Sequence, residues 1–390
     1  MDYLYPIFII QMAGKSKKIK ILFTIPNFDT AGSGKALFKI ASGLDREVFE
    51  PHIACLHNRG EYFKVIQKSG IPVHVFEFTS SVRPVLKGLY QCWRKSRFFL
   101  HHGFHLVHSF HYGPDYSEPL AAKIAGVKWG FTKKNMNWGG ASKNGWKIRS
   151  YLADFIALQN SDMKNEFYPD TKKTFYVPRG VDTAEFFKAA EDKDLKQELG
   201  LDKDTKVVLN VANMVPVKGL EVLIRAFKNI VYHKVVLILV GDNRNEYGRS
   251  LENLVRELGL ENRVIFTGKT LNVKRFLSIA DLFVLPTLNE GRKEGSPVAM
   301  LEAMASGVPV IGTKIPGVKD QLKKFPDAQV DAGDISSLAA RIDQYLFSDR
   351  DWRLKFSDQL CSEVQECFDL KREIKRHEQM YIDTLKPTNK

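Results

Sequence analysis

Apolar residues in this chain fall into short continuous runs, separated by stretches with helical spacing. The run Ile19 to Ile25 is nearly unbroken and rich in β-branched residues, as expected of a strand buried on both faces of a parallel sheet. From Ala36 the apolar spacing changes to the helical period, which predicts a glycine loop opening a helix. Further strands are expected at 52–56, 72–77, 105–110, 128–132 and 154–158. This alternation predicts a doubly wound α/β domain.

The second half repeats that architecture after a charged stretch at 188–206, which has the composition of a linker. A helix from Ser250 to Leu258 is expected to end at Gly259. The predicted strands are 207–211, 235–240, 264–267, 282–285 and 308–311. The predicted boundaries are 1–184 for the first domain and 185–365 for the second, with 366–390 forming a C-terminal helix that packs back on the first domain.

Composition narrows the class of protein. With 390 residues, 44% hydrophobic and 26% charged, the chain has the balance of a folded protein of two domains, which excludes disordered and collagen-like chains. Lys and Arg outnumber Asp and Glu by 58 to 45, a formal charge of +13. Such a surface attracts phosphates, nucleic acid or an anionic membrane, and charge alone does not choose among them.

The cysteines and the first residues bear on the compartment. The four cysteines form no C-x-x-C pair, which predicts a reduced, cytosolic chain without a cysteine metal site. The opening ten residues are apolar but short, and a Lys-rich stretch follows them instead of a cleavage site. We therefore expect neither a signal peptide nor a membrane span, and a natural start at Met12 is equally consistent.

The most informative stretch runs from Asn289 to Gly307 and has the pattern of a strand end, a glycine loop and a helix start. Ser296 suits the N-cap and Pro297 the first helical position, so the helix should run to about Ser306. Its amino terminus would offer unpaired N–H groups and a positive dipole at the carboxyl edge of the sheet. Such a site suits a phosphate or a hydroxyl-rich ligand.

Two glutamates accompany this helix start. Glu294 lies in the loop, and Glu302 lies in the helix, where side chains lean back toward the amino terminus. Both carboxylates would then flank one ligand. Alternatively, Glu302 is a surface residue and Glu294 merely favours the helix dipole, and spacing alone leaves both interpretations open.

Four motifs in this order resemble the GT-B-fold retaining glycosyltransferases of the family-four type, in which two glutamates are separated by seven residues. The motifs are Gly180-Val181-Asp182-Thr183, Leu239-Val240-Gly241-Asp242, Ala280 to Pro286, and Glu294 to Glu302 followed by Ala303 to Val310. The resemblance covers nearly the whole chain. It implies two Rossmann-like domains facing across a cleft, with the N-terminal domain on the acceptor side, the C-terminal domain on the donor side, and a sugar nucleotide as donor.

The resemblance also implies roles for individual residues. Glu294 would hold the donor sugar near the reacting centre, and Glu302 would bind the ribose hydroxyls. Gly295 and Ser296 would supply backbone N–H groups to the sugar or diphosphate, and Pro297 beside them would also belong to the donor site. Lys218 matches one of two basic residues that contact the phosphates. Asn213 stands where arginine is commoner, and the candidates for the missing charge are Arg292 and Lys293.

The chemistry of the reaction also requires positive charge at this site, independently of the family resemblance. Breaking the bond between a sugar and a nucleoside diphosphate leaves negative charge on the departing phosphate oxygens. Lys218 and helix N–H groups can stabilise that charge. The Asp-x-Asp pairs at 192/194, 202/204 and 349/351 lie in charged linker-like or helix-flanking sequence, so we expect no required metal and no cofactor.

In the first domain, Gly32 and Gly34 stand where the family has a glycine pair near the donor phosphates, although a glycine loop needed only for a tight turn remains open. An NTPase phosphate loop is excluded because Lys35 precedes Ala36 and lacks the upstream glycine.

The same domain offers candidates on the acceptor side. Histidines crowd between 101 and 111, but the strand pattern sends neighbours to opposite faces and argues against zinc. We expect His108 or His111 at the strand's carboxyl end facing the cleft. Asn135 is a candidate contact to the donor or acceptor sugar, and no general base is identifiable.

Residues 82–104 combine apolar and aromatic residues at helical spacing with several Lys and Arg. Such a helix can lie on an anionic membrane. An ordinary amphipathic crossover helix with a solvated basic face explains the pattern too.

The resemblance thus implies a retaining, metal-independent hexosyltransferase that moves a sugar from a nucleotide donor, UDP-linked by family frequency, to a glycan or glycolipid hydroxyl in cell-surface polysaccharide biosynthesis. We expect it in the cytoplasm, at the inner face of the membrane. A non-catalytic GT-B-fold binding or scaffold subunit is the alternative, supported by Asn213. A nucleic-acid partner is not expected, because only net charge suggests one.

Overall fold

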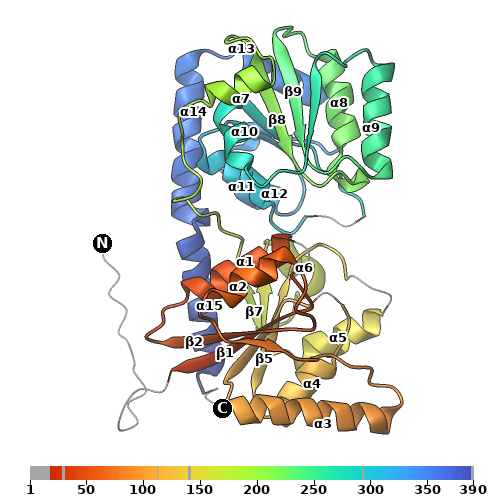
Figure 1. The fold of residues 1–390 in the computed structure, drawn as a ribbon, viewed down its shortest axis with the longest axis vertical. Coiled ribbons are helices and arrows are strands. Elements are labelled where there is room, and N and C mark those ends of the chain that lie inside the picture. Colours follow the sequence, from red (N-terminus) through yellow and green to blue (C-terminus); the bar gives the residue numbers. More distant parts are fainter. Residues whose placement is uncertain (1–17, 29–30, 112, 139–141, 292–293, 388–390) are drawn as a thin grey trace. The chain divides into compact units, whose positions relative to one another are not determined.

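The computed structural model describes residues 18–28, 31–111, 113–138, 142–291 and 294–387. Two parallel sheets with helices packed around them make up this part of the chain, as Figure 1 shows. The predicted fold class, two Rossmann-like α/β domains, is confirmed.

The first sheet consists of β1 (Ile19–Ile25), β2 (Phe49–Cys55), β3 (Val73–Val75), β4 (Leu106–Ser109), β5 (Lys128–Lys133), β6 (Phe155–Leu158) and β7 (Thr174–Tyr176). Its helices are α1 (Ala31–Gly43), α2 (Glu61–Gln67), α3 (Val85–His102), α4 (Ser117–Ile124), α5 (Lys143–Leu152) and α6 (Asp162–Phe167). The order across the sheet is β3-β2-β1-β4-β5-β6-β7. The winding therefore reverses between β1 and β4.

The second sheet consists of β8 (Lys206–Val211), β9 (Val235–Val240), β10 (Val264–Gly268), β11 (Leu282–Leu285), β12 (Val310–Thr313) and β13 (Gln329–Val330), in the order β10-β9-β8-β11-β12-β13. The accompanying helices are α7 (Lys193–Glu198), η1 (Pro216–Lys218), α8 (Leu220–Asn229), α9 (Glu246–Glu257), α10 (Val273–Ile279), α11 (Val298–Ala305), α12 (Val318–Gln321), η2 (Pro326–Ala328), α13 (Ile335–Phe347), α14 (Arg350–Glu363) and η3 (Val364–Phe368). Helix α15 (Leu370–Leu385) follows, and its Tyr381 packs on Phe23 of β1 and Phe49 of β2 in the first sheet. The winding reverses between β8 and β11.

The core of the second sheet follows from its sequence. All six residues of β9 are buried, as a central parallel strand with helices on both faces requires. Helix α8 presents Leu223, Ile224 and Phe227 to this core and leaves its charged residues in solvent. Helix α9 begins at Glu246, earlier than predicted, because Asn245 caps it, and Gly259 follows its end with φ 62° as expected.

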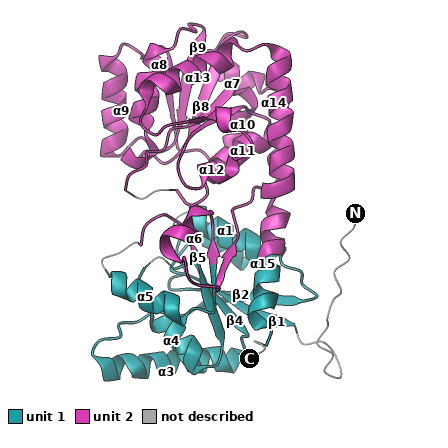
Figure 2. Ribbon diagram, turned by 180° about the vertical axis from the view of Figure 1, so that it is seen from behind, with its two compact units in different colours: residues 1–132, 139–156, 377–390 teal, residues 133–138, 157–376 magenta. Residues whose placement is uncertain are grey.

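The chain forms two compact units, drawn in different colours in Figure 2: unit 1 comprises 1–132, 139–156 and 377–390, and unit 2 comprises 133–138 and 157–376. These limits differ from the predicted split at 184/185, which stays a prediction. Among the described residues, every helix is too short or too polar to cross a bilayer.

Candidate active site

The loops that follow β8 and β11 leave the sheet where its winding reverses. In open α/β sheets, ligands bind in the crevice at this switch point, outside the carboxyl ends of the strands. Lys218 lies in the loop after β8, and Glu294 lies in the loop after β11. The topology therefore brings the two predicted catalytic residues to one edge of unit 2.

The backbone joins these two loops. The N–H of Leu288 donates to the carbonyl of Val217 at 2.8 Å. Gly219 has φ 66°, and a Cβ at this position would lie 2.1 Å from the carbonyl oxygen of Pro286. Only glycine fits both the left-handed conformation and this close approach. Lys218 is thus held between two points where the loops touch.

Lys218 and Glu294 form an ion pair through Nζ and Oε1, and both side chains keep some contact with solvent. Exposed ion pairs add little to stability, because solvent screens them and long side chains lose entropy. An ammonium and a carboxylate in this position can each exchange the other for a ligand: the ammonium for a phosphate, the carboxylate for a sugar hydroxyl.

Helix α11 begins one residue later than the sequence predicted. Its N-cap is Pro297, so the prediction of Ser296 as N-cap and Pro297 as first helical residue was wrong. The physical reason is that the Ser296 hydroxyl does not cap the helix: its oxygen accepts from Gln321 Nε2 at 3.1 Å. The predicted end is confirmed, since Gly307 follows the helix with φ 70°.

Gln321 is a site residue that the sequence reasoning missed. It is almost wholly buried, and its Nε2 also donates to the carbonyl of Pro297 at 3.2 Å. A carbonyl only accepts, which fixes the orientation of this amide. Gln321 therefore positions both residues that lead into α11. A buried glutamine in a short helix carries no sequence signal for such a role.

Gly295 is buried in unit 2. Its carbonyl accepts from Asn160 Nδ2 at 2.7 Å, and a Cβ would lie 2.0 Å from the carbonyl oxygen of Lys134. From the other side, a Cβ on Gly317 would lie 2.5 Å from the Gly295 oxygen. The packing of this loop therefore requires glycine at 295 and at 317. Asn160 and Gly317 were also missed, because their partners are far away in the sequence.

The remaining predicted donor residues lie around this loop. Glu302 stands in the second turn of α11 and is half-buried, so it is neither a fully solvated surface residue nor enclosed. Asn213 is exposed in the loop after β8. Arg292 and Lys293, the candidates for the missing positive charge, lie outside the described residues.

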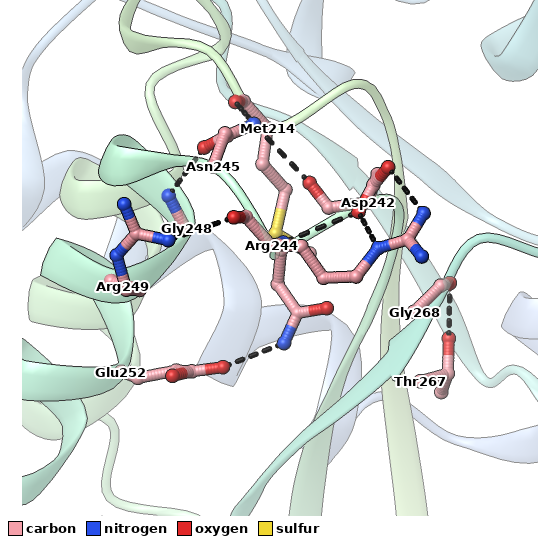
Figure 3. A network of polar contacts seen from close by, with 10 residues as sticks. Met214, Asp242, Arg244, Asn245, Gly248, Arg249, Glu252, Thr267 and Gly268 are labelled. Atoms are coloured by element: carbon pink, nitrogen blue, oxygen red, sulfur yellow. Dashed lines mark hydrogen bonds and ion pairs between the residues drawn. The ribbon is translucent and has the colours of Figure 1, made fainter.

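The end of β9 is tied to the same edge by Asn245 (Figure 3). Its side-chain oxygen accepts from the N–H of Gly248 at 2.7 Å, and its amide donates to the carbonyl of Met214 at 3.0 Å. One residue thus caps α9 and fixes the loop after β8. Next to it, Arg244 pairs with Asp242 at 2.8 Å and lowers the pKa of that carboxyl to about 2. The polar spacing before α9 is a recognisable capping signal.

In unit 1, Gly32 and Gly34 lie in the first turn of α1. A Cβ on Gly34 would lie 2.8 Å from the ring of Phe28, so close packing against this ring explains why a glycine stands at position 34. Gly32 is exposed, and a Cβ there would meet open space. Their predicted contact with donor phosphates stays a prediction.

His108 does not lie at an open strand end. It is wholly buried in β4, with Nδ1 2.7 Å from the hydroxyl of Tyr381 and Nε2 2.8 Å from Oγ1 of Thr132. Both ring nitrogens are engaged in the interior, so the prediction that His108 faces the acceptor is wrong. His111 is half-buried beside Phe78, at a ring-centroid distance of 6.2 Å, and remains a candidate.

Asn135 is half-buried in unit 2, and its carbonyl accepts from Lys133 Nζ at 2.7 Å. The same ammonium donates to the carbonyl of Asn137 and lies 4.1 Å from the ring centre of Phe167. Burial lowers the pKa of Lys133 to about 7, with Glu166 opposing the shift. Lys133 therefore fixes the loop that carries Asn135, a role that the sequence did not reveal.

Two surface hollows lie elsewhere in unit 2. The larger, of about 700 Å³, is lined by charged residues that include Lys324 and Glu363, which form an ion pair at 2.5 Å. Lys324 also lies 3.6 Å from Glu366, and none of the predicted site residues lines this hollow, so we assign it no catalytic role. No group of three or more His, Cys, Asp or Glu in the described part of the chain could hold a metal ion.

Comparison with known proteins shows which sequences and folds this chain resembles. Residues 191–359 match the family described as Glycosyl transferases group 1. The chain is 32% identical over 208 residues to N-acetyl-alpha-D-glucosaminyl L-malate synthase of Bacillus anthracis, covering 53% of this chain and 52% of the relative. It is 32% identical over 192 residues to the UDP-Gal:alpha-D-GlcNAc-diphosphoundecaprenol alpha-1,3-galactosyltransferase of Escherichia coli, covering 47% and 48%. The chain thus spans about half the length of these curated relatives.

Solved structures resemble nearly the whole chain. A glycosyltransferase from Rickettsia africae superposes with a TM-score of 0.84 at 19% identity, over 95% of this chain and 100% of that one. Anabaena HepE, solved with UDP and glucose, gives 0.76 at 20% identity, over 94% and 100%. At such identities the likeness establishes the fold alone. The similarity to group 1 glycosyltransferases in sequence therefore lies in residues 191–359, and the likeness in fold extends over nearly the whole chain.

Proposed function

We propose that this chain is a retaining glycosyltransferase that transfers a sugar from a UDP-linked donor to a hydroxyl of a glycan or glycolipid acceptor. The observation that carries the proposal is the Lys218–Glu294 pair at the switch point of unit 2, beside the start of α11 and inside the region that matches the family. Relatives named for cell-surface glycans, such as a teichuronic acid enzyme of Bacillus subtilis, support a role in polysaccharide biosynthesis.

In the proposed reaction, the bond between C1 of the sugar and the phosphate oxygen breaks, and the acceptor oxygen forms a bond to C1 on the same face. The acceptor proton passes to the departing phosphate, so a protein nucleophile is not needed. Lys218 leaves Glu294 to meet the growing phosphate charge, together with N–H groups at the start of α11. This arrangement supplies positive charge from the protein, and we propose that no metal is required.

The other assignments follow the same logic. Glu294 holds the donor sugar, Glu302 binds the ribose hydroxyls, and the loop from Gly295 to Pro297 lies against the diphosphate. We place the protein in the cytoplasm, where nucleotide sugars are made, with a peripheral contact to the inner membrane face.

The test combines a donor screen with product analysis. Sugar nucleotides are screened by ligand-observed NMR for binding and slow hydrolysis, with and without EDTA. The anomeric configuration of the product is then read from its proton coupling. Retention of the donor configuration and equal rates with EDTA are expected; inversion, or a rate abolished by EDTA, contradicts the mechanism.

A single substitution tests the proposed role of Glu302 in binding the ribose hydroxyls of the donor. Glu302→Ala should raise the donor KM and lower turnover, and unchanged donor kinetics would remove its role. Donor binding with no transfer to any acceptor would instead favour the non-catalytic subunit.

A further inference from the structure

The buried and exposed residues of helix α3 in unit 1 differ from those expected of an ordinary amphipathic crossover helix. Helix α3 packs against α4, and its buried residues are small or polar except for one phenylalanine: Gly88, Cys92, Lys95, Ser96 and Phe99. A Cβ on Gly88 would lie 2.6 Å from the backbone of Val82, so the chain approaches this side closely. A solvated helix is expected to show the opposite pattern, with large apolar residues inside.

The large apolar residues of α3 lie on its exposed side. Leu86 is 84% exposed, and Tyr90 and Trp93 stack on each other with ring centres 6.0 Å apart. We define the α3 face as the exposed residues Val85, Leu86, Leu89, Tyr90, Trp93 and Leu100. Because these positions recur at helical spacing, they form one stripe. In both ribbon views α3 lies at the periphery of unit 1, beside α4 (Figures 1 and 2).

The charges around this stripe have one sign. Arg83, Lys87, Arg94 and Arg97 are exposed. The guanidinium of Arg97 lies 5.7 Å from the ring centre of Trp93. The sequence has no Asp or Glu between Glu77 and Asp115. An apolar stripe with an all-basic border is complementary to a surface that combines apolar chains with negative charge.

We propose that the α3 face docks on an anionic lipid bilayer, with the helix lying in the plane of the interface. Aromatic rings such as Tyr90 and Trp93 suit the headgroup level, and the basic border attracts anionic lipids. A second copy of this chain is a poorer occupant, because a symmetric contact through the same face would bring like charges together. The docking rests on the proposed function in one respect: it presents the enzyme to an acceptor carried on a lipid.

The test is flotation of the full chain with vesicles of phosphatidylglycerol and phosphatidylcholine in equal parts, compared with pure phosphatidylcholine. The wild type should bind the anionic vesicles at low salt and lose binding as salt rises. The double variant Leu86→Ser/Trp93→Ser should bind at least about tenfold more weakly. Leu271→Ser is the matched control, since Leu271 is 86% exposed and lies in unit 2, and it should bind like the wild type.

Charge variants separate the basic border from the apolar stripe. Lys87→Glu/Arg94→Glu should weaken binding to anionic vesicles at least about tenfold, whereas Lys193→Glu, at an exposed lysine of α7, should have little effect. Equal binding by the wild type and both double variants would overturn the proposal. So would stronger retention on duplex DNA than on the vesicles.

Binding of UDP by the same variants keeps this result apart from the proposed function. A variant that loses vesicle binding but retains the wild-type affinity for UDP supports the α3 face as a separate docking surface. If vesicle binding holds and UDP binding is absent in every form, the donor assignment fails while the docking stands.

Discussion

The two sheets carry polar groups at the same topological position, yet they use them differently. In unit 1, between β1 and β4, Glu118 is wholly buried and accepts from Oγ1 of Thr24 at 2.6 Å and Oγ of Ser109 at 2.7 Å. Arg149, also wholly buried, donates to Ser109 at 3.1 Å. In unit 2, between β8 and β11, Lys218 and Glu294 pair directly and keep contact with solvent.

This difference indicates that the polar groups of unit 1 stabilise the fold, whereas those of unit 2 are accessible to a ligand. Burial raises the pKa of Glu118, and Arg149 opposes that shift. Arg149 is itself held over the ring of Trp129 at 4.9 Å and donates to the carbonyl of Asp115 at 2.9 Å. The edge of unit 1 is therefore closed by its own hydrogen bonds, whereas the charges of unit 2 can exchange partners. Substitution of Arg149 in unit 1 should therefore cost stability, and substitution of Lys218 in unit 2 should cost activity.

The largest expected effect is on stability in unit 1. Arg149→Met leaves the buried Glu118 without its compensating charge, and we expect the free energy of unfolding to fall by about 3–5 kcal/mol, measured by urea titration. Arg263→Met is the matched control, because Arg263 also lies over a ring, that of Phe227, at 4.9 Å. A loss for Arg149→Met no larger than for this control would remove the distinction between the two edges.

The next effect is on catalysis in unit 2. Lys218→Ala should lower kcat/KM by a factor on the order of 100–1,000, because the departing phosphate loses its main positive partner. The melting temperature should stay within about 2–4 °C, since a partly exposed ion pair adds little stability. Lys206→Ala is the matched control. It removes a comparable ion pair, with Asp281 at 2.7 Å, at the other end of β8, and the enzyme should therefore keep its activity. Equal activity losses in both variants would contradict the assignment.

A smaller effect is expected on the pH dependence of stability, through Lys133 in unit 2. The unfolded chain keeps this lysine protonated up to about 10.5, while the folded chain releases the proton near 7. Between these values the unfolded state binds more protons, so stability should rise with pH, by about 2 kcal/mol from pH 7 to 9. Lys133→Met should lack this rise relative to the wild type in urea titrations across that range. The same slope in both forms would show that Lys133 stays charged in the fold.

The smallest effect concerns the positioning of the loop before α11. Gln321→Met keeps the size of the side chain but removes its hydrogen bonds to Ser296 and Pro297, so the donor KM should rise about fivefold to tenfold with kcat less affected. Gln329→Met is the control, because Gln329 Nε2 donates to the carbonyl of Leu322 at 2.9 Å and this variant keeps the hydrogen bonds from Gln321 to Ser296 and Pro297. If both variants lower stability alike and leave KM unchanged, Gln321 is purely structural.

The sequence predicted the strands best where apolar runs are continuous. The bounds of β9 and β11 match the predicted 235–240 and 282–285. Strand β2 begins at Phe49, earlier than the predicted 52–56. Pro51 interrupts the apolar run in the sequence, but in the structure Pro51 pairs with Ile21 of β1 and the strand continues through it. The short edge strands β7 and β13 were missed, since they have only three and two residues and no apolar run.

The candidate site shows a similar limit. Spacing placed Glu294 in a loop before a helix, and the family resemblance pointed to Lys218. The structure brings the two together because both follow strands that meet at one edge. His108 was misplaced because its partner Tyr381 lies 273 residues away, and a strand pattern does not reveal which element covers each face. Gln321 was missed for the same reason. Likewise, apolar and basic spacing marked α3 as amphipathic, but only the structure shows that its apolar side is exposed.

The proposed donor site at the edge of unit 2 is tested most directly by titrating UDP into the chain with ¹³C-labelled methionine methyl groups. Met214 lies in the loop after β8 and Met300 in α11, whereas Met380 lies in α15 within unit 1. The signals of Met214 and Met300 should shift in proportion to the bound fraction, and that of Met380 should stay unchanged. A shift of Met380 with Met214 and Met300 unmoved would contradict a donor site at this edge.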